Sequence, residues 1–267
     1  MIALQRHRNI LRRITEAGSA RVAELARDLD VTEETIRRDL KVLAEQGVIA
    51  RTHGGAMAIE PEDIHRDLPY EQRHATSPTQ KQAIARAAVE LIQPGQVVAL
   101  DPSSTACHLA RLIPDQPLTV VTNSLVVCSI LADRGHVEVI CTGGTLDAEA
   151  MAFFGLQTQR ALETLTVEHL FFSCRGLDPQ RGLSEANDRH VAVKLAMIDA
   201  ARHRTLMVDT SKIGLASTVL YTSAEVADRL IVDEPNDDAG RRAVEALRDK
   251  QLRVEIAPLL HEAKSRA

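Results

Sequence analysis

Aromatic side chains are scarce in this sequence: tryptophan is absent, and Phe and Tyr together make up 2% of the 267 residues. We therefore expect a hydrophobic core built from Val, Leu, Ile and Ala. No apolar run approaches the roughly 20 residues that a membrane-spanning helix needs, so no membrane partner is expected. The opening residues, MIALQRHRNILRRI, carry charges throughout, which argues against a secretory signal.

Several motifs that carry chemistry are also missing. The four cysteines lie in apolar stretches and form no CxxC pair, so neither a zinc site nor a disulfide framework is predicted. There is no P-loop, no GxGxxG and no Ser-His-Asp order to indicate nucleotide, dinucleotide or acyl-transfer chemistry. We expect a protein of the reducing cytoplasm with no metal ion, no cofactor and no catalytic residue.

The composition that remains is that of an ordinary globular protein, with 45% apolar and 26% charged residues. The net charge of −5 is unevenly distributed. Residues 1–59 hold 10 Lys and Arg against 8 Asp and Glu, whereas the remainder holds 22 against 29. The N-terminal part is the better candidate for contact with a polyanion, although its positive excess is small.

The first 58 residues predict three helices and a hairpin. Apolar residues recur at helical spacing in 4–17 and 19–30, and Thr32 suits the N-cap of a third helix with acidic residues in its first turn. The sequence VIARTHGGAMAI then alternates as two short strands around a glycine turn. This order is the outline of a winged helix-turn-helix.

The third helix is the candidate DNA-reading element. A recognition helix enters the major groove with its N-terminal half leading, and an arginine fork that donates twice to guanine contributes about 1–3 kcal/mol of discrimination. Ile36, Leu40 and Leu43 form the apolar stripe that faces inward. We expect DNA contacts from the outward residues of this helix and from the hairpin: Thr32, Glu34, Thr35, Arg37, Arg38, Lys41, Arg51, His53 and Gly54.

An alternative interpretation of the same helix is open. Glu33 and Arg37, like Glu34 and Arg38, are four residues apart in the order that favours ion pairing along a helix. Arginines paired in this way could belong to an ordinary solvated face. The order of helix, turn, capped helix and glycine-containing hairpin favours the DNA-reading interpretation.

Beyond residue 58 the pattern changes twice. Residues 59–77 are polar and lack clean periodicity, which is typical of a linker. From residue 78 onward, apolar runs alternate with helical segments, which indicates parallel strands covered on both faces. The expected strands are QVVAL, LTVVT, VEVICT, EHLFFS, RTLMVD, RLIVD and LRVEI, and the expected helices are 103–112, 124–133, 148–164, 188–203 and 238–249.

The predicted fold class is therefore α/β. A winged helix-turn-helix occupies residues 1–58, a linker residues 59–77, and a doubly wound, Rossmann-like domain residues 78–267. In an open α/β sheet, ligands bind beyond the carboxyl ends of the strands, where the first turn of a helix can bind phosphate. The polar and small residues expected to bind a ligand there are Asp101, Ser103, Ser104, Thr105, Thr122, Asn123, Ser124, Gly143, Gly144 and Lys212.

The segment VAELARDLDVTEETIRRDLKVLAEQGVIARTHGG resembles the N-terminal signature of the DeoR family of bacterial transcription regulators, and the resemblance continues along almost the entire chain. It implies a winged helix-turn-helix fused to a sensor domain that is similar to ribose-5-phosphate isomerase and binds a phosphorylated sugar. The loop DPSST departs from the family pattern, because Ser103 stands where glycine is usual and Pro102 precedes it. That departure puts a phosphate contact from the Ser103 backbone in doubt.

The central segment FFSCRGLDPQRGLSEANDRHVAVK also resembles the family. It implies ligand contacts from Arg175, Glu185 and Asn187, with Lys194 as a second charge near the site. Each of these residues has an alternative role: Arg175 could pair with a surface carboxylate, Asn187 could cap a helix, and Lys194 could face solvent.

Three functions are open on this basis. The favoured one is a transcription regulator, usually a repressor of a sugar-catabolism operon, that binds double-stranded operator DNA and a phosphorylated sugar. Because one winged helix covers one half-site, a homo-oligomer (dimer or tetramer) is expected. The second is a sugar-phosphate isomerase-like enzyme with an added N-terminal domain, in which Asp101, Glu185 and Lys212 are the acid–base groups. The third is an architectural DNA-binding protein without a ligand.

Overall fold

The computed structural model describes residues 3–17, 19–45, 49–52, 54–58, 64–235, 237–250 and 252–259. By its contacts the chain divides into two compact units. Met1–Asp63 and Glu71–Pro78 form the first, which we call the N-terminal unit. Ile64–Tyr70 and Thr79–Ala267 form the second, which we call the C-terminal unit.

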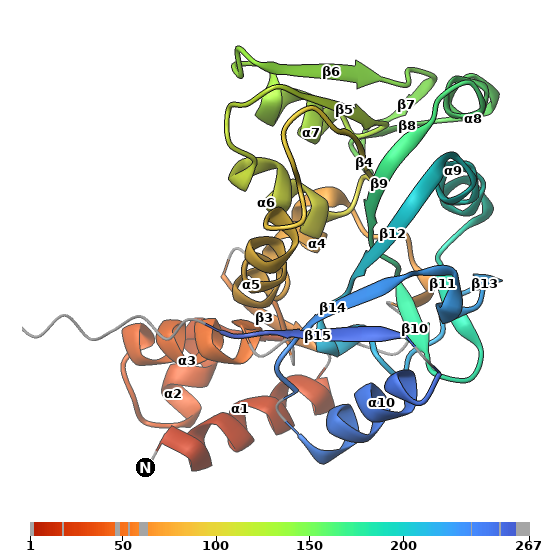
Figure 1. The fold of residues 1–267 in the computed structure, drawn as a ribbon. Coiled ribbons are helices and arrows are strands. Elements are labelled where there is room, and N and C mark those ends of the chain that lie inside the picture. The colour runs from red at the N-terminus through yellow and green to blue at the C-terminus, as the bar shows by residue number, and fades with distance from the viewer. Residues whose placement is uncertain are drawn as a thin grey trace, which may run out of the picture. The chain divides into compact units, whose positions relative to one another are not determined.

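The N-terminal unit contains helices and a three-stranded antiparallel sheet. Its first three helices are α1 (Ala3–Ala17), α2 (Val22–Asp28) and α3 (Glu33–Glu45) (Figure 1). Its strands β1 (Ser19–Arg21), β2 (Ile49–Thr52) and β3 (Gly55–Ala58) pair in the order β1-β3-β2. One apolar cluster joins these elements, and its largest buried side chains are Ile10, Ile14, Leu25, Ile36, Leu40, Leu43 and Ile49. The predicted winged helix-turn-helix and the inward stripe of its third helix are confirmed.

The start of the second helix differs from the prediction. Ser19–Arg21 forms β1, which pairs antiparallel with β3, so α2 begins only at Val22. A side-chain carbon on Gly55 would lie 2.1 Å from the carbonyl oxygen of Ala20, so this close pairing requires glycine. The strand was missed because its partner lies beyond the third helix in sequence, and local periodicity does not detect such a pairing.

The C-terminal unit is built on a parallel sheet with seven strands among its described residues. They are β4 (Val97–Leu100), β5 (Leu118–Thr122), β6 (Val137–Cys141), β9 (Val167–Phe172), β12 (Ala201–Met207), β14 (Arg229–Asp233) and β15 (Arg253–Ala257). Their order is β15-β14-β12-β9-β4-β5-β6, and all neighbours are parallel (Figure 1). The predicted strands and the doubly wound fold are confirmed, with the order reversing between β4 and β9.

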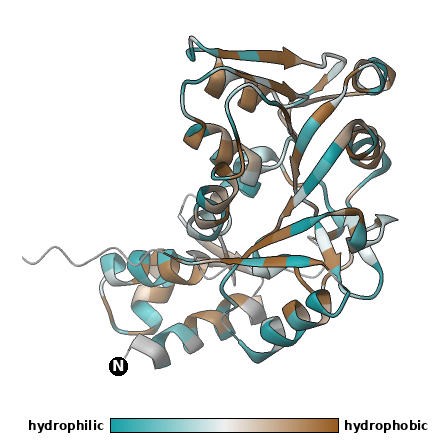
Figure 2. Cartoon of the chain, in the orientation of Figure 1, coloured by the Kyte–Doolittle hydropathy of each residue, from teal (hydrophilic) through white to brown (hydrophobic). Residues whose placement is uncertain are grey.

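Side chains that alternate along each strand divide the core between the two faces of this sheet. Val98 and Leu100 point to one face, which is covered by α5 (Pro78–Val89), α6 (Ser104–Leu112) and α7 (Leu125–Leu131). Ala99 points to the other face, which is covered by α8 (Leu156–Glu163), α9 (Asp188–Ala200) and α10 (Asp238–Arg248). Figure 2 shows the resulting brown, apolar stretches along the strands. Burial on both faces explains why the strands are continuous apolar runs in the sequence.

The helix predicted over 148–164 is wrong in its first half. β7 (Thr145–Asp147) and β8 (Ala152–Phe154) form an antiparallel pair there, and α8 begins only at Leu156. Met151 and Gly155 have φ angles of 52° and 101°, which an α-helix does not accommodate. The helix predicted over 188–203 also ends early, because β12 begins at Ala201.

A second, antiparallel sheet was not predicted. It consists of β10 (Gly176–Asp178), β11 (Gly182–Glu185) and β13 (Val219–Thr222), paired in that order. Leu183 faces Thr222 and Ser184 faces Leu220, so Tyr221 is the extra residue of a β-bulge in β13.

Part of the predicted linker is bonded into the C-terminal unit. The carbonyl oxygen of Ile64 accepts from Arg175 Nε at 3.4 Å and from the hydroxyl of Ser217. The carboxylate of Asp67 accepts from the side-chain amide of Asn187 at 2.8 Å. We call residues 64–70 the strap. Helix α4 (Tyr70–Ala75) follows it, and residues 59–63 lie outside the described part of the chain.

Candidate functional site

Helix α3 begins with a side-chain cap. The hydroxyl oxygen of Thr32 accepts from the backbone N–H of Thr35 at 3.2 Å and lies 2.9 Å from the Thr35 hydroxyl. Glu33 and Glu34 occupy the first turn, where the helix dipole favours negative charge. The predicted cap is therefore present, and the side chains of Thr32 and Thr35 contact each other at the end of the helix expected to lead into the groove.

The arginines of α3 are both exposed and paired. Arg37 lies 2.6 Å from Glu33, and Arg38 lies 3.5 Å from Glu34. The Arg37 side chain is 51% exposed and that of Arg38 is 80% exposed. Exposed pairs of this kind contribute about 0–1 kcal/mol, so exchanging a carboxylate for a nucleic acid costs little. Pairing along the helix and availability to DNA are therefore compatible.

The inner side of α3 is anchored to α1 by a buried carboxylate. Asp39 accepts from Arg6 Nη2 at 3.0 Å and lies 3.0 Å from His7 Nε2. Burial alone would raise the pKa of Asp39, but the hydrogen bonds and charges of Arg6 and His7 hold that pKa below its usual value. This charged anchor fixes which face of α3 carries the arginines outward.

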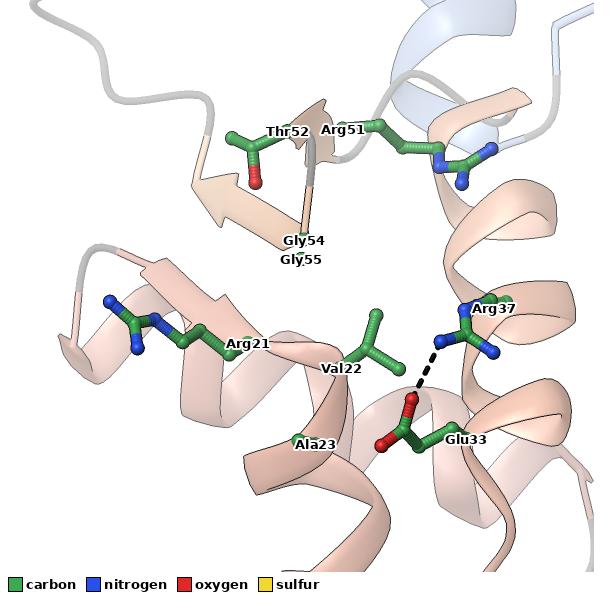
Figure 3. Close-up of a pocket in the computed structure, with 9 residues that line it drawn as sticks. All are labelled: Arg21, Val22, Ala23, Glu33, Arg37, Arg51, Thr52, Gly54 and Gly55. Carbon is green, nitrogen blue, oxygen red and sulfur yellow. Dashed lines mark hydrogen bonds and ion pairs between the residues drawn. The ribbon is translucent and has the colours of Figure 1, made fainter.

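A hollow of about 280 Å³ lies between the start of α2, helix α3 and the hairpin of β2 and β3. In Figure 3, Arg37 points toward Glu33, Arg51 extends from the hairpin toward α3, and Arg21 extends away from the other lining side chains. Arg21 was not predicted as a DNA-contacting residue. Its signal in the sequence was weak, because it lies outside the third helix and the hairpin.

The other predicted DNA contacts lie on the same unit. Lys41 and Arg51 are exposed on α3 and β2. Gly54 lies in the turn of the hairpin, and its carbonyl oxygen accepts from the backbone N–H of Val22 at 2.9 Å. His53 lies outside the described residues.

In the C-terminal unit, Asp101 is the centre of a buried polar network where β4 ends. Its carboxylate accepts from Lys194 Nζ at 2.5 Å and from the backbone N–H groups of Ser173 and Ser103 at 3.0 and 3.1 Å. Burial alone would raise the pKa of Asp101, but the charge of Lys194 and these hydrogen bonds hold that pKa below its usual value. The network joins the ends of β4 and β9, where the strand order reverses.

Lys194 is more central than the sequence indicated. It is buried on α9, where its Nζ also lies 3.3 Å from Glu185 and donates to the Ser173 carbonyl at 2.7 Å. Burial alone would lower the pKa of Lys194, but the two carboxylates outweigh it and raise that pKa. A lysine beside the apolar residues Val193 and Met197 was the available signal, because a buried lysine needs a partner.

Lys212 is the second cation at this edge of the sheet. It ends the short turn Thr210–Lys212, and its Nζ donates to the Ser173 hydroxyl at 3.3 Å and lies 3.8 Å from Asp209. The Lys212 side chain is 19% exposed, against 5% for Lys194. Of these two lysines, Lys212 is the more accessible to a ligand.

Several predicted ligand contacts are bonded within the protein instead. The hydroxyl oxygens of Ser103 and Ser124 cap α6 and α7, and the amide oxygen of Asn187 caps α9. The hydroxyl of Thr122 donates to the carbonyl of Leu100 at 2.7 Å. The N–H of Ser103 is also bonded, to Asp101. These four side chains hold this edge of the sheet in shape, and a ligand contact from a cap would have to compete with that role.

Four of the buried oxygen atoms that lack a hydrogen-bond partner within the described protein lie near strand ends. They belong to residues that follow β4, β5, β6 and β12 at one edge of the sheet: Thr105 Oγ1, Asn123 Oδ1, Thr142 Oγ1 and Asp209 Oδ2. Buried polar atoms nearly always have a partner in folded proteins. Thr142 was not among the predicted site residues, although it directly precedes the predicted glycine pair.

The two glycines after β6 differ in what surrounds them. Their φ angles are 64° at Gly143 and 116° at Gly144. A side-chain carbon at Gly144 would lie 2.2 Å from Thr158 Oγ1 and 2.6 Å from the Phe154 carbonyl oxygen, whereas at Gly143 it would meet nothing within 4 Å. Gly144 therefore makes room for neighbouring protein, contrary to the expectation that it opens a path for a ligand. Gly143 leaves open space.

The remaining predicted residues lie around this edge. Ser104 is buried in the first turn of α6. Glu185 is paired with Lys194. The backbone N–H of Arg175 donates to the Ser184 carbonyl at 3.0 Å, and its side chain donates to the strap at Ile64. The Arg175 side chain, which was expected to contact the ligand, thus contacts the segment that precedes α4.

The described residues hold no group of three or more His, Cys, Asp or Glu side chains placed to bind a metal ion. All four cysteines lie in this part of the chain, and they are free thiols. Within the same residues, no helix combines the length and the apolar character needed to cross a membrane.

Solved structures share only a low likeness with this chain. Ribose 5-phosphate isomerase A of Methanocaldococcus jannaschii is 17% identical over 49% of this chain and 52% of its own, with a TM-score of 0.37. A similarity at that level carries no argument about activity.

Two family descriptions match the chain. The DeoR-like helix-turn-helix domain matches residues 6–62, and the DeoR C terminal sensor domain matches residues 76–234. An uncharacterised HTH-type transcriptional regulator of Bacillus subtilis, YulB, is 36% identical over 97% of this chain and 98% of its own. The L-fucose operon activator of Haemophilus influenzae is 36% identical over 86% of this chain and 91% of its own. The putative aga operon transcriptional repressor of Escherichia coli O157:H7 is 31% identical over 86% of both chains. The chain belongs to the DeoR family of helix-turn-helix transcriptional regulators, which joins a DNA-binding domain to a sensor domain.

Proposed function

We propose that this regulator controls a sugar-catabolism operon by binding a phosphorylated sugar at the carboxyl edge of the large sheet. The four buried oxygen atoms without a hydrogen-bond partner, together with Lys212 at 3.8 Å from Asp209, carry the proposal. Asn123 Oδ1 and Asp209 Oδ2 can only accept hydrogen bonds, and the hydroxyl groups of a sugar supply donors. Lys212 and the N-terminus of α6 supply positive charge and N–H groups for a phosphate.

The DNA-binding half of the proposal rests on the exposed arginines of α3. Arg37 and Arg38 would read base edges, and Arg51 would contact backbone phosphate. Since one recognition helix covers one half-site, we propose a homodimer or a tetramer on a two-fold operator. The relatives include an operon activator and an operon repressor, so a transcription assay must be able to detect either activation or repression.

We propose that the sensor binds its sugar without converting it. A general base works best with a pKa near the operating pH. The pKa of Asp101 is held below its usual value, and its carboxylate is bonded to Lys194. Glu185 is paired with the same lysine. These carboxylates suit a rigid binding site better than proton transfer.

A thermal-shift titration of the full chain tests this proposal. The probes are ribose 5-phosphate, glucose 6-phosphate, fructose 1-phosphate and the three unphosphorylated sugars. We expect at least one phosphorylated sugar to raise Tm, because a ligand at 100 times its Kd stabilises the folded state by about 2.7 kcal/mol. Its unphosphorylated form should have no effect, and no isomerised product should form.

The same sugar phosphate should change the affinity for operator DNA, and DNA should change the affinity for the sugar by the same factor. Turnover of a probe would instead favour the isomerase-like enzyme. Stabilisation by none of the probes would favour a DNA-binding protein without a ligand.

A further inference from the structure

We infer that Tyr221 binds the ligand of the sensor, donating its hydroxyl to an oxygen of the sugar moiety. This inference rests on the proposed function and adds a residue that belongs to neither the predicted site nor the strand ends of the large sheet. It assigns Tyr221 a part in selecting the sugar, separate from the capture of phosphate by Lys212.

The backbone around Tyr221 is built to redirect this side chain. Tyr221 is the extra residue of the β-bulge opposite Leu183 and Ser184, and bulges next to binding sites commonly re-aim a side chain. The facing strand β11 ends at Glu185, the residue paired with Lys194. Gly182 begins that strand, and a side-chain carbon there would lie 2.2 Å from the Thr222 carbonyl oxygen. The close approach of the two strands at the bulge therefore depends on glycine.

The Tyr221 hydroxyl is buried and has no hydrogen-bond partner within the described protein. The ring packs against the apolar cluster beneath α9, so the aromatic part alone would be served equally well by phenylalanine. A buried hydroxyl left unpaired costs about 1–3 kcal/mol. A ligand that accepts a hydrogen bond from this hydroxyl would explain why the position holds tyrosine and not phenylalanine.

The charges around the Tyr221 hydroxyl indicate which part of the ligand it binds. Burial raises the pKa of Tyr221 well above its ordinary value, and the charges of Cys174, Glu185 and Asp101 raise it further. Tyr221 therefore remains a neutral donor at physiological pH. Nearby carboxylates disfavour a phosphate dianion at the same place, whereas Lys212, which donates to the Ser173 hydroxyl, offers the phosphate a cation. The oxygen that accepts from Tyr221 thus belongs to the sugar.

Substitution of the hydroxyl alone tests the inference in the full chain. Tyr221→Phe should raise the Tm of the ligand-free protein by about 2–4 °C, because it removes an unpaired buried group. By isothermal titration calorimetry, it should weaken binding of the sugar phosphate that stabilises the wild-type protein by about five- to tenfold. Binding of inorganic phosphate, and binding of DNA without sugar, should not change.

Tyr70→Phe is the matched control, since Tyr70 is the other tyrosine of the chain. Burial raises the pKa of Tyr70 to about 12, and Arg111 and Cys107 act on the same hydroxyl, so the same atom deletion tests the loss of a buried hydroxyl elsewhere and should leave sugar affinity unchanged. A lowered Tm of Tyr221→Phe, or an unchanged sugar affinity, would overturn this inference while the proposed function stands. If no sugar phosphate of the panel binds the wild-type protein, both proposals fail.

Discussion

Lys194 and Asp101 form a buried ion pair, with 2.5 Å between Nζ and Oδ2, that ties helix α9 to the end of β4. Glu185 adds a second carboxylate 3.3 Å from the same ammonium group. The three charges lie under the edge proposed to bind ligand, and nearly all of their polar atoms are engaged with protein. The main role of these three charged residues is therefore to hold the site in shape.

Lys194→Met should destabilise the protein strongly, because it leaves the Asp101 carboxyl buried without its cation. Breaking a buried pair from one side costs about 3–5 kcal/mol, which urea unfolding at pH 7 would measure. Lys212→Met is the control: its pairing with Asp209 is looser, at 3.8 Å, and Lys81 remains as a second cation that lowers the pKa of Asp209, so the cost should be smaller than that of Lys194→Met. Lys212→Met should lose sugar-phosphate binding instead. Equal stability losses in the two variants would contradict this division of roles.

The raised pKa of Asp233 should make the stability of the folded protein depend on pH. Burial, followed by the charge of Asp209, raises the pKa of Asp233 to about 6. An unfolded aspartate titrates near about 3.9, so between these values the folded state holds a proton that the unfolded state has released. The contribution of Asp233 to stability is therefore present below about pH 4, declines as pH rises to about 6, and stays low above that.

Asp233→Asn should remove this decline and stabilise the protein at pH 7 by about 1–2 kcal/mol. The asparagine can keep both contacts of Asp233, accepting from the Thr210 N–H and donating to the Thr210 hydroxyl, which lie at 2.7 and 2.9 Å. Unfolding free energies of both proteins from pH 4 to pH 8 provide the comparison. A variant less stable than wild type at pH 7 would show that the Asp233 charge is not penalised by its surroundings.

Arg38→Ala should weaken operator binding about 10- to 100-fold, as expected for a lost base contact of about 1–3 kcal/mol. The fold should be unaffected because the side chain is 80% exposed. An operator selected from random duplexes by the wild-type protein serves as the probe in an anisotropy assay. Arg248→Ala on α10 removes an exposed arginine, paired with Glu245, from the other unit. Similar losses in both variants would mean that only net charge is being read.

Glu33→Gln should raise affinity for a mixed-sequence duplex about threefold, because it releases Arg37 and removes a negative charge from the hollow. Thermal stability should fall slightly, since an acidic residue in the first turn contributes about 0.3–1 kcal/mol. Glu245→Gln, which breaks a comparable surface pair with Arg248, should leave DNA affinity unchanged. Weaker DNA binding by Glu33→Gln would mean that the carboxylate holds Arg37 in its binding position.

The large sheet could be predicted from the sequence because its strands are buried on both faces. Segments such as Leu118–Thr122 and Arg229–Asp233 are apolar enough to identify without their partners. Elements defined by long-range pairing could not be found in this way. Residues 148–150 favour a helix locally, but the pairing of β7 with β8 places them in a turn. The bulge at Tyr221 likewise depends on how β13 meets β11.

The candidate site also has parts that the sequence could predict and parts that it could not. Asp101 and Lys212 could be placed at strand ends by the sheet rule alone. The sequence could not show which hydroxyls are used as caps, because Ser103, Ser124 and Thr105 all carry a hydroxyl shortly after a strand, and only the structure shows that the two serines cap helices while the Thr105 hydroxyl has no hydrogen-bond partner. Lys194 was underestimated for a related reason: its immediate neighbours on α9, residues 191–193 and 195–198, are apolar, and its carboxylate partners come from other segments of the chain.

The strap changes how the two halves of this regulator can be separated by engineering. Residues 64–70 belong to the C-terminal unit, 71–78 to the N-terminal unit, and the chain then returns at residue 79. The polypeptide passes from one half to the other three times, so no single cut yields two intact modules. A chimera that joins residues 79–267 to a foreign DNA-binding domain would contain the donors Asn187 and Ser217 but not their acceptors Asp67 and Ile64. The foreign sequence would have to supply those acceptors.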